Sequence, residues 1–346
     1  GLPLIRDTIF RIYSMTKPIT SVAVLILVER GQLLLSDPVS KHLPELAGMK
    51  VLRTPSSPLG DVVPARREMT IRDLLTHTSG LASSMPGVGT PTAIEQAYAK
   101  ADLRGSQTSL APEAWIRGLA QVPLVHQPGT KFLYGVSTDV LGHLVAVVSG
   151  MPFETFLARE IFEPLGMVDT GFHVPAAKLD RFAANYGPGP DGKLALVDSP
   201  QTSRYAKPPS FPSGAGGLVS TIDDYLRFCE MLRRQGELDG RRILSRKSIE
   251  LMTLNHLTAE ERDVPMLTGW FPGQGFGLGF SVVEALAPGG TLGSVGQYGW
   301  GGAAGTYFWV DPEEDLIAIL MVQLYPPGGI PLIPEFKNGV YQAIVD

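Results

Sequence analysis

Cysteine is nearly absent from the sequence, and its scarcity narrows the possible chemistry. The single cysteine, Cys229, excludes an internal disulfide and a zinc site built on cysteines. It falls within a helical pattern as a core residue and is not a candidate nucleophile. The six histidines show no His-Glu-x-x-His spacing, and no two of them lie three or four residues apart. We therefore expect no metal site.

Long hydrophobic runs and an excess of one charge are missing too. The longest apolar run, Val22 to Val28, is well short of the roughly 18–20 residues that cross a bilayer, so no membrane span is expected. A net charge of −5 without any block of like charge argues against a nucleic-acid partner. No signal peptide is visible, although the opening residues, GLPLIRDTIF, read as the interior of a fold. These absences slightly favour a soluble, cytoplasmic protein, while a missing upstream segment would leave the compartment open.

The composition is that of an ordinary globular protein with room for two domains. Hydrophobic residues make up 44% and charged residues 18% of the 346 residues. Residues 14–30 are apolar nearly all round, as in a helix buried in a core, and Gly31 follows as a C-terminal stop. If the helix begins near Ser14, then Ser14 and Lys17 are neighbours on one face. The hydroxyl then lies at the positive end of the helix dipole.

The rest of the chain shows two kinds of sequence pattern. Residues 38–205 consist mainly of short helical runs separated by Pro and Gly. Near residue 213 the pattern changes to glycines followed by a helix, and strand-like runs come after residue 275. The last two runs are joined by the turn 311–314, which implies antiparallel pairing. We expect an α/β (α+β) fold in which 1–37 and 206–346 form a mainly antiparallel sheet flanked by helices, with 38–205 as an inserted helical domain.

Several common catalytic signatures are absent. Gly-x-Ser-x-Gly does not occur, since GVSTD at 135–139 lacks the final glycine, and this disfavours a Ser–His–Asp α/β-hydrolase. GQGFGLG at 273–279 is not Gly-x-Gly-x-x-Gly, and no Walker loop exists, so a nucleotide site has no support. Three separated stretches remain as candidates: SMTK at 14–17, YGVS at 134–137 and WGG at 300–302.

With these stretches the chain resembles the serine β-lactamase and penicillin-binding-protein superfamily of class C type, and within it the family VIII carboxylesterases. The nucleophile motif RIYSMTKPIT is very similar, and ERGQLLLSDPV, TIRDLLTHTSGL, PGTKFLYGVS, GAGGLVST and GWGGAAGTYFWVDPE follow in family order over nearly the whole chain. Two positions depart from class C β-lactamases. Val136 replaces the Asn that follows the catalytic Tyr, and 300–302 replaces Lys-Thr-Gly. The family's helix and hairpin before the nucleophile are not seen here.

The resemblance implies a catalytic set of Ser14, Lys17 and Tyr134. A serine hydroxyl is a weak nucleophile and needs a base within hydrogen-bond reach. Lys17 can serve if burial disfavours its ammonium form, and Tyr134 can pass a proton to the leaving group if Lys17 stabilises its phenolate. Which of the two is the working base stays open. The alternatives are a helix-end lysine in solvent and a core aromatic residue.

The remaining site residues follow from the same resemblance. The backbone N–H groups of Ser14 and Ala303 would form the oxyanion hole. Glycines near the active-site strand would leave an edge along which a substrate can lie. A Gly-rich loop without a role and a plain core tryptophan are the alternatives. The implied substrate contacts are Val136, Trp300, Gly301 and Gly302.

We expect a serine carboxylesterase that hydrolyses small, short-chain esters through an acyl-enzyme and uses no cofactor. His77, in HTSGL, is expected to be structural rather than a general base. The first rival is a β-lactamase or a D-amino-acid-specific peptidase on the same site. The second is a non-catalytic scaffold of this fold, against which the intact Ser14, Lys17 and Tyr134 set argues. Acyl chain length, alcohol preference, stereoselectivity and oligomeric state do not follow from the sequence.

Overall fold

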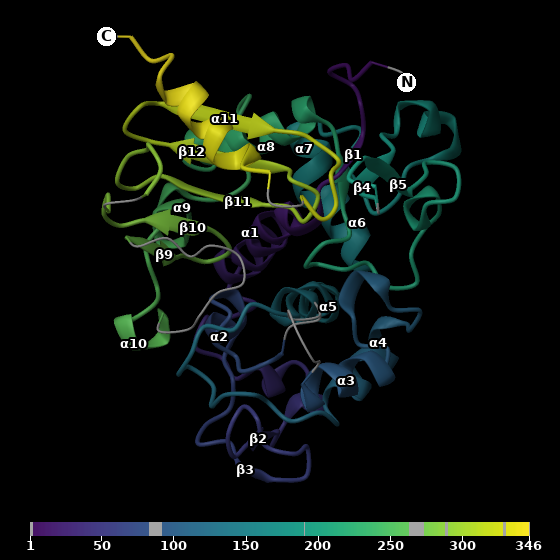
Figure 1. The fold of residues 1–346 in the computed structure, drawn as a ribbon. Helices are drawn as coiled ribbons and strands as arrows, with labels where there is room; N and C mark the ends of the chain where they lie inside the picture. The colour runs from purple at the N-terminus through teal and green to yellow at the C-terminus, as the bar shows by residue number, and fades with distance from the viewer. Residues whose placement is uncertain are drawn as a thin grey trace.

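Helix α1 (Thr16–Glu29) lies in the middle of the molecule, between a five-stranded sheet and a group of helices (Figure 1). It is buried on all sides over most of its length, as the apolar run predicted. Its first turn is preceded by a short 3-10 helix, η1 (Tyr13–Met15), so the predicted helix over 14–30 is confirmed apart from its first residues. The computed structural model describes residues 3–82, 92–189, 191–262, 273–287, 290–327 and 330–345.

The five-stranded sheet is a continuous antiparallel meander. The strands follow the order β13-β12-β11-β10-β9, so each pairs with its neighbour in sequence. The turn between β12 and β13 begins after Asp311, as predicted. The expected mixed fold with a mainly antiparallel sheet is therefore confirmed. The strands are β9 (Gln274–Phe276), β10 (Ser281–Val283), β11 (Tyr298–Gly301), β12 (Tyr307–Asp311) and β13 (Leu316–Leu320).

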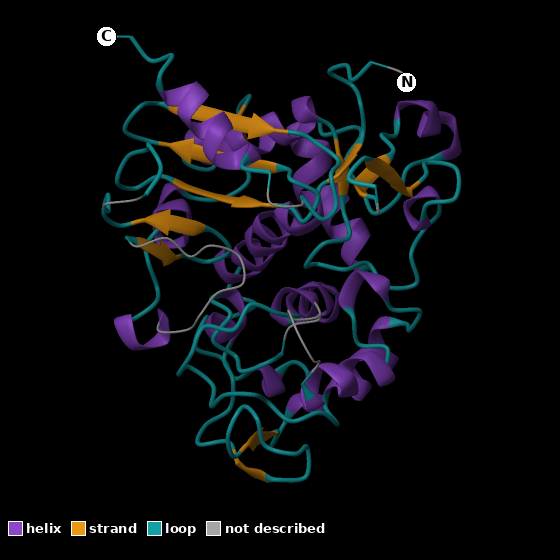
Figure 2. Cartoon of the chain, in the orientation of Figure 1, coloured by secondary structure: helices purple, strands orange, loops and turns teal. Residues whose placement is uncertain are grey.

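Helices cover both faces of this sheet, as the ribbon in Figure 2 shows. Successive side chains of a strand point to opposite faces, and β12 illustrates this alternation. The Phe308 ring packs against Tyr225 of α8, with centroids 5.0 Å apart. The Trp309 ring packs against Phe336 of α11 at 5.6 Å. The covering helices are α8 (Ile222–Arg233), which Thr221 caps, and α11 (Leu332–Tyr341).

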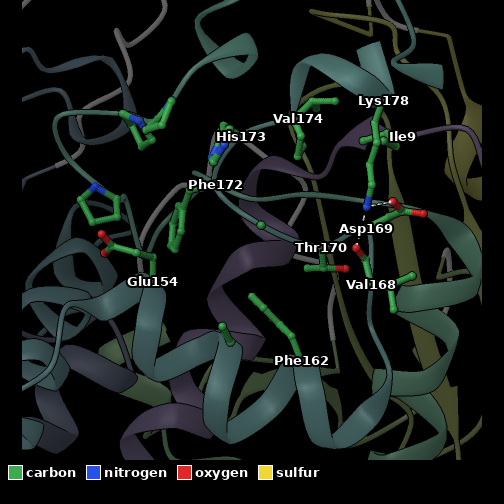
Figure 3. Close-up of a pocket in the computed structure, with 16 residues that line it drawn as sticks. Ile9, Glu154, Phe162, Val168, Asp169, Thr170, Phe172, His173, Val174 and Lys178 are labelled. Atoms are coloured by element: carbon green, nitrogen blue, oxygen red, sulfur yellow. Dashed lines mark hydrogen bonds and ion pairs between the residues drawn. The ribbon is translucent and has the colours of Figure 1, made fainter. Parts of the chain in front are cut away.

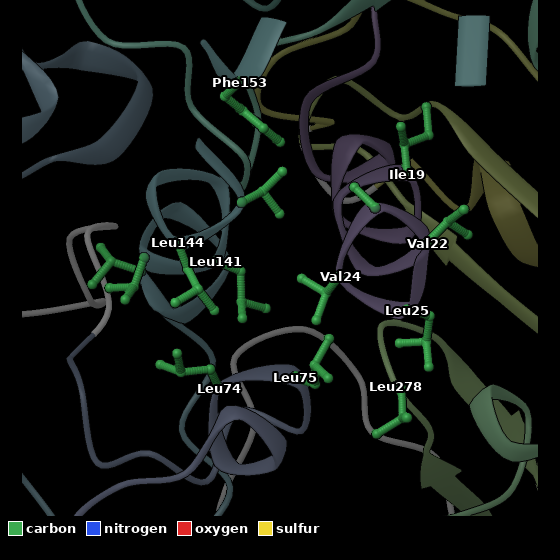
Figure 4. Close-up of a cluster of buried hydrophobic side chains, with 14 of the residues drawn as sticks. Ile19, Val22, Val24, Leu25, Leu74, Leu75, Leu141, Leu144, Phe153 and Leu278 are labelled. Carbon is green, nitrogen blue, oxygen red and sulfur yellow. The ribbon is translucent and has the colours of Figure 1, made fainter. Parts of the chain in front are cut away.

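The opposite side of α1 packs against the helical half of the chain. Leu141 and Leu144 of α5 lie in the same buried cluster as Val24 of α1 and Leu74 of α2 (Figure 4). This shared core joins the sheet half to the helical half, because α1 contributes side chains to both. The helices of this half are α2 (Ile71–Leu75), α3 (Ala93–Lys100), α4 (Pro112–Leu119), α5 (Ser137–Ser149), α6 (Phe153–Leu157) and α7 (Glu163–Leu165).

Short two-stranded pairs complete the fold. Segments between 171 and 205 lie beside the sheet half, since bridges join Phe182 to Ile9 and Tyr186 to Leu324. The division of the chain into 1–37 with 206–346 and 38–205 stays a prediction. The remaining elements are β1 (Phe10–Arg11), β2 (Lys50–Leu52), β3 (Val62–Pro64), β4 (Asn185–Pro188), β5 (Leu194–Asp198), β6 (Val219–Ser220), β7 (Glu237–Leu238), β8 (Arg241–Arg242), α9 (Arg246–Met252) and α10 (Ala259–Arg262).

Within the described ranges, no individual helix has both the length and the apolar character that crossing a bilayer requires. The segments Ser137–Ser149 and Phe153–Leu165 have that length and apolar character only when they are counted together, and the chain bends by 81° between them.

Candidate active site

Ser14 follows a sharp bend in the backbone at the start of α1. Tyr13 has φ +42°, a left-handed conformation that is uncommon for a residue other than glycine. The Tyr13 ring stacks on Tyr325, with centroids 5.7 Å apart, and its hydroxyl accepts a hydrogen bond from Asn185 Nδ2 at 3.1 Å. These contacts hold the bend in place. Ser14 then lies in a first helical turn, where backbone N–H groups have no intrahelical acceptor.

Lys17 points back towards Ser14, as their spacing on one helix face predicted. Lys17 Nζ donates to Ser14 Oγ at 3.1 Å and to the Ala215 carbonyl oxygen at 2.8 Å. It also lies 4.4 Å from the centre of the Tyr134 ring. The lysine is only 4% exposed, so it is not a helix-end lysine in solvent. The structure thus brings Tyr134 next to Ser14 and Lys17, although it lies far from them in the sequence.

Tyr134 is held between the lysine and the active-site strand. Its hydroxyl accepts a hydrogen bond from Trp300 Nε1 at 3.3 Å, and the two rings lie 5.5 Å apart. Trp300 therefore contacts Tyr134 directly. Val136, the other predicted substrate contact near Tyr134, is fully buried at the N-cap of α5. Neither Val136 nor Trp300 lines the cavity that contains Ser14, so their prediction as substrate contacts is not supported by the lining of that cavity.

His77 packs against the ring of Tyr134 and contacts the backbone of the next residue, Gly135. Its ring centre is 4.8 Å from that of Tyr134, and its Nδ1 accepts a long hydrogen bond from Gly135 N at 3.4 Å. Burial, and then the charge of Lys17, lower the pKa of His77 well below its usual value. The imidazole is therefore neutral at neutral pH. This environment fits the structural role expected for it.

The glycines after Trp300 allow parts of the protein to approach one another closely. A Cβ on Gly302 would lie 2.5 Å from the Ile12 carbonyl oxygen and would also collide with Thr306 Oγ1. A Cβ on Gly301 would meet the Tyr307 ring at 2.8 Å. Gly302 thus allows the end of β11 to lie against the segment that carries Ser14, and Gly301 leaves room for the Tyr307 ring of β12.

Ala303 lies in the turn after β11 and faces the same cavity as Ser14. The hydrogen bonds of this turn run from Gly302 N to Thr306 O at 2.7 Å and from Gly305 N to Gly302 O at 3.0 Å. Among the backbone hydrogen bonds of the described residues, none uses the Ala303 N–H as donor. The two N–H groups expected to form an oxyanion hole are thus at one cavity.

The cavity that contains Ser14 has a volume of about 190 Å³. Ser14, Lys17, Tyr134 and Ala303 all line it, which gathers the core of the predicted site in one place. Sequence reasoning missed several other lining residues, because no motif marks them and they come from distant segments. They include Tyr13, Arg104, Asp139, Arg204, Ala215 and Tyr325.

Asp139 is the acidic residue at the base of this cavity. It is 2% exposed, and its Oδ1 accepts hydrogen bonds from Ser213 Oγ at 2.5 Å and Ala215 N at 3.1 Å. The Ala215 carbonyl in turn accepts from Lys17. Burial raises the pKa of Asp139, against the opposing effects of Ser213 and Lys17. Asp139 therefore fixes the backbone segment that orients the lysine.

Removal of the Asp139 carboxylate is expected to slow catalysis through Lys17. Asp139→Ala should lower kcat by up to about a hundredfold, since small displacements of catalytic groups are costly. Asp139→Asn should lose less, because its Oδ1 can still accept from Ala215 N. Steady-state kinetics on a nitrophenyl ester measures both, with the exposed Asp191→Ala as the control. A folded Asp139→Ala variant with the kcat of the wild type would contradict this role.

A larger cavity, of about 430 Å³, lies away from the predicted residues (Figure 3). Two of its charged groups are paired with each other, since Lys178 Nζ lies 2.7 Å from Asp169 Oδ1, and Lys178 also donates to Val168 O at 3.0 Å. None of Ser14, Lys17 and Tyr134 lines it. We assign the chemistry to the smaller cavity, because it holds a hydroxyl and an amine in contact.

Comparisons with known proteins identify the relatives of this chain. The family model "Beta-lactamase" matches residues 1–332. Protein Rv1367c of Mycobacterium tuberculosis is 41% identical over 94% of this chain and 80% of that protein. Esterase EstB of Burkholderia gladioli is 31% identical over 99% of this chain and 84% of the esterase. The solved structure of "EstCE1, a hydrolase with promiscuous acyltransferase activity" superposes with a TM-score of 0.80, at 28% identity, over 98% of this chain and 86% of that one.

The matches extend over nearly the whole chain, as the order of its motifs predicted. The resemblance to the esterases of this superfamily is confirmed by EstB and EstCE1. The chain therefore belongs to the beta-lactamase family, with a fold of the class C β-lactamase and penicillin-binding-protein type.

Proposed function

We propose that the protein is a serine carboxylesterase that acts on small esters through an acyl-enzyme. The observation that carries this proposal is the 3.1 Å hydrogen bond between Lys17 Nζ and Ser14 Oγ, at a cavity open to a substrate. Similarity to Esterase EstB supports an ester as the substrate. The volume of about 190 Å³ favours a small acyl group.

In the proposed reaction, Ser14 Oγ attacks the ester carbonyl carbon and its proton passes to Lys17 or Tyr134. The N–H groups of Ser14 and Ala303 stabilise the tetrahedral oxyanion. The carbon–oxygen bond to the alcohol then breaks, and the leaving oxygen takes the proton. Water attacks the resulting acyl-enzyme and releases the acid. No group other than the side chains and backbone of this chain is needed.

A panel of nitrophenyl esters and a chromogenic cephalosporin tests this function against the β-lactamase alternative. We expect brisk hydrolysis of short-chain esters and slow turnover of the cephalosporin. Trp300 occupies the position at which class C β-lactamases have a lysine on the active-site strand. Its indole N–H donates to Tyr134, and it has no charge that could bind the carboxylate of the cephalosporin. A lost charge-assisted contact is worth about 1.5–3 kcal/mol, or roughly tenfold or more in specificity. If kcat/KM for the cephalosporin matches that for the best ester, the β-lactamase alternative prevails.

Acyl transfer to an alcohol is the second candidate function. The structural relative EstCE1 combines hydrolysis with promiscuous acyltransferase activity. An acyl-enzyme serves both reactions, except that an alcohol replaces water as the acceptor in acyl transfer. Product analysis of nitrophenyl butyrate turnover with added butanol separates the two. Hydrolase action predicts butyric acid as the main product, and acyltransferase action predicts butyl butyrate.

A further inference from the structure

Two arginines from separate parts of the chain line the catalytic cavity. Arg104 immediately precedes the turn Gly105–Gln107, and Arg204 begins the turn Arg204–Ala206. Arg204 Nη1 donates to the Ser106 carbonyl oxygen at 2.5 Å, and its Nη2 donates to Ser106 Oγ at 3.2 Å. These bonds join the two turns, so Arg104 and Arg204 belong to neighbouring segments of the cavity lining.

The charge of this lining is opposite to that of the protein as a whole. Lys17, Arg104 and Arg204 are its cations, and Asp139 is the sole acid among the described lining residues. Asp139 is buried and already accepts hydrogen bonds from the 213–215 segment. The chain nevertheless carries a net charge of −5. A positive lining in an acidic protein attracts anions to the cavity.

Neither arginine forms an ion pair with a carboxylate within the described part of the chain, although, against the effect of burial, Tyr205 and the charge of Asp198 help to raise the pKa of Arg204. Arg204 donates to neutral oxygens of Ser106 and Tyr205. Burial raises the pKa of Asp102, but the hydrogen bonds from Ser109 and Thr108 and then the charge of Arg104 bring it below its usual value. The Asp102 carboxylate itself accepts from Ser109 N and Oγ, each at 2.8 Å. Both side chains are exposed, so a solute that enters the cavity can reach them.

We propose that the substrate is a small ester that also carries a carboxylate, which binds Arg104 and Arg204 while the ester carbonyl lies at Ser14. This inference rests on the proposed esterase function and names its substrate class. A planar guanidinium binds a carboxylate through two parallel hydrogen bonds, which a lysine cannot do. Lys17 is buried and bonded to Ser14 and Ala215, so the exposed arginines are the groups left for the substrate anion.

The test compares each carboxylate ester with its neutral methyl ester. Mono-4-nitrophenyl glutarate and its methyl ester place the charge on the acyl side; 4-carboxyphenyl acetate and its methyl ester place it on the alcohol side. We expect wild-type protein to favour the charged member of at least one pair. Arg104→Gln should lower that kcat/KM ratio by about tenfold, and Arg104→Glu should lower it further. Rising ionic strength should lower the wild-type ratio as well.

Arg66→Gln is the matched control, because Arg66 is exposed and lies outside the cavity, and its change alters the net charge by the same amount. Its ratio should equal that of the wild type. The inference is overturned if Arg104→Gln leaves the ratio unchanged in both pairs while the neutral esters are still hydrolysed. Absence of turnover for every ester by wild-type protein would overturn the esterase function and this inference together.

Discussion

Ser14→Ala is expected to lower ester hydrolysis by about three orders of magnitude or more, with the fold intact. The substitution removes the proposed nucleophilic oxygen, so the proposed acyl-enzyme cannot form and only weak assistance from the cavity remains. The neighbouring groups keep their places, because Lys17 Nζ still has the Ala215 carbonyl as acceptor. The measurement is kcat/KM on nitrophenyl acetate, together with labelling by a fluorophosphonate probe and mass spectrometry.

Ser21→Ala is the matched control for this experiment. Ser21 lies in the same helix and is buried, but it does not line the catalytic cavity. The Ser21→Ala variant should react with the probe at Ser14, whereas the Ser14→Ala variant should carry no adduct. Near-normal turnover by folded Ser14→Ala would refute the nucleophile assignment. Lack of a Ser14 adduct on active wild-type protein would do the same.

Lys17→Arg should be nearly as damaging as Lys17→Ala, with losses of at least about a hundredfold in kcat. Lys17 Nζ is in contact with Ser14 Oγ, the Ala215 carbonyl and the Tyr134 ring, and the residue is only 4% exposed. A guanidinium is larger and planar and does not give up its proton, so it replaces neither the shape nor the chemistry of the amine. Steady-state kinetics on the same ester measures the loss, and circular dichroism checks that each variant is folded.

Lys41→Arg provides the comparison for the same change at an exposed position. Lys41 pairs with Asp37 on the surface, and its side chain is 54% exposed. Activity of this variant should equal that of the wild type. High activity of Lys17→Arg would show that only a positive charge is required there, and the assignment of Lys17 to proton transfer would then be wrong.

The predictable parts of the fold are those in which local pattern and tertiary environment agree. Apolar residues nearly all round residues 14–30 predicted a buried helix, and α1 is one. The strand-like runs on either side of the turn after Asp311 predicted a hairpin, and β12 and β13 form it. The spacing of Ser14 and Lys17 predicted their contact, because a helix makes residues three apart neighbours.

The unpredicted parts depend on contacts between distant segments. The left-handed backbone of Tyr13 is held by Tyr325 and Asn185, and nothing local to Tyr13 indicates it. Arg104 and Arg204 reach one cavity because Arg204 bonds to Ser106, which lies 98 positions earlier in the chain. Asp139 follows Tyr134 closely, yet its role comes from its bonds to the 213–215 segment. Spacing along the chain carries no information about such pairs.

The order in which the site residues occur has a consequence for synthesis on the ribosome. Ser14 is translated 289 residues before Ala303 (303 − 14), and the sheet that flanks α1 is also formed from the last part of the described chain. A ribosome that adds about 5–20 residues per second therefore needs roughly 15–60 seconds between the two. During that interval the apolar α1 has no sheet to cover it and would be a target for molecular chaperones. The nascent chain thus contains the proposed nucleophile early, whereas the proposed oxyanion hole is complete only when β11 and the turn after it have emerged and paired.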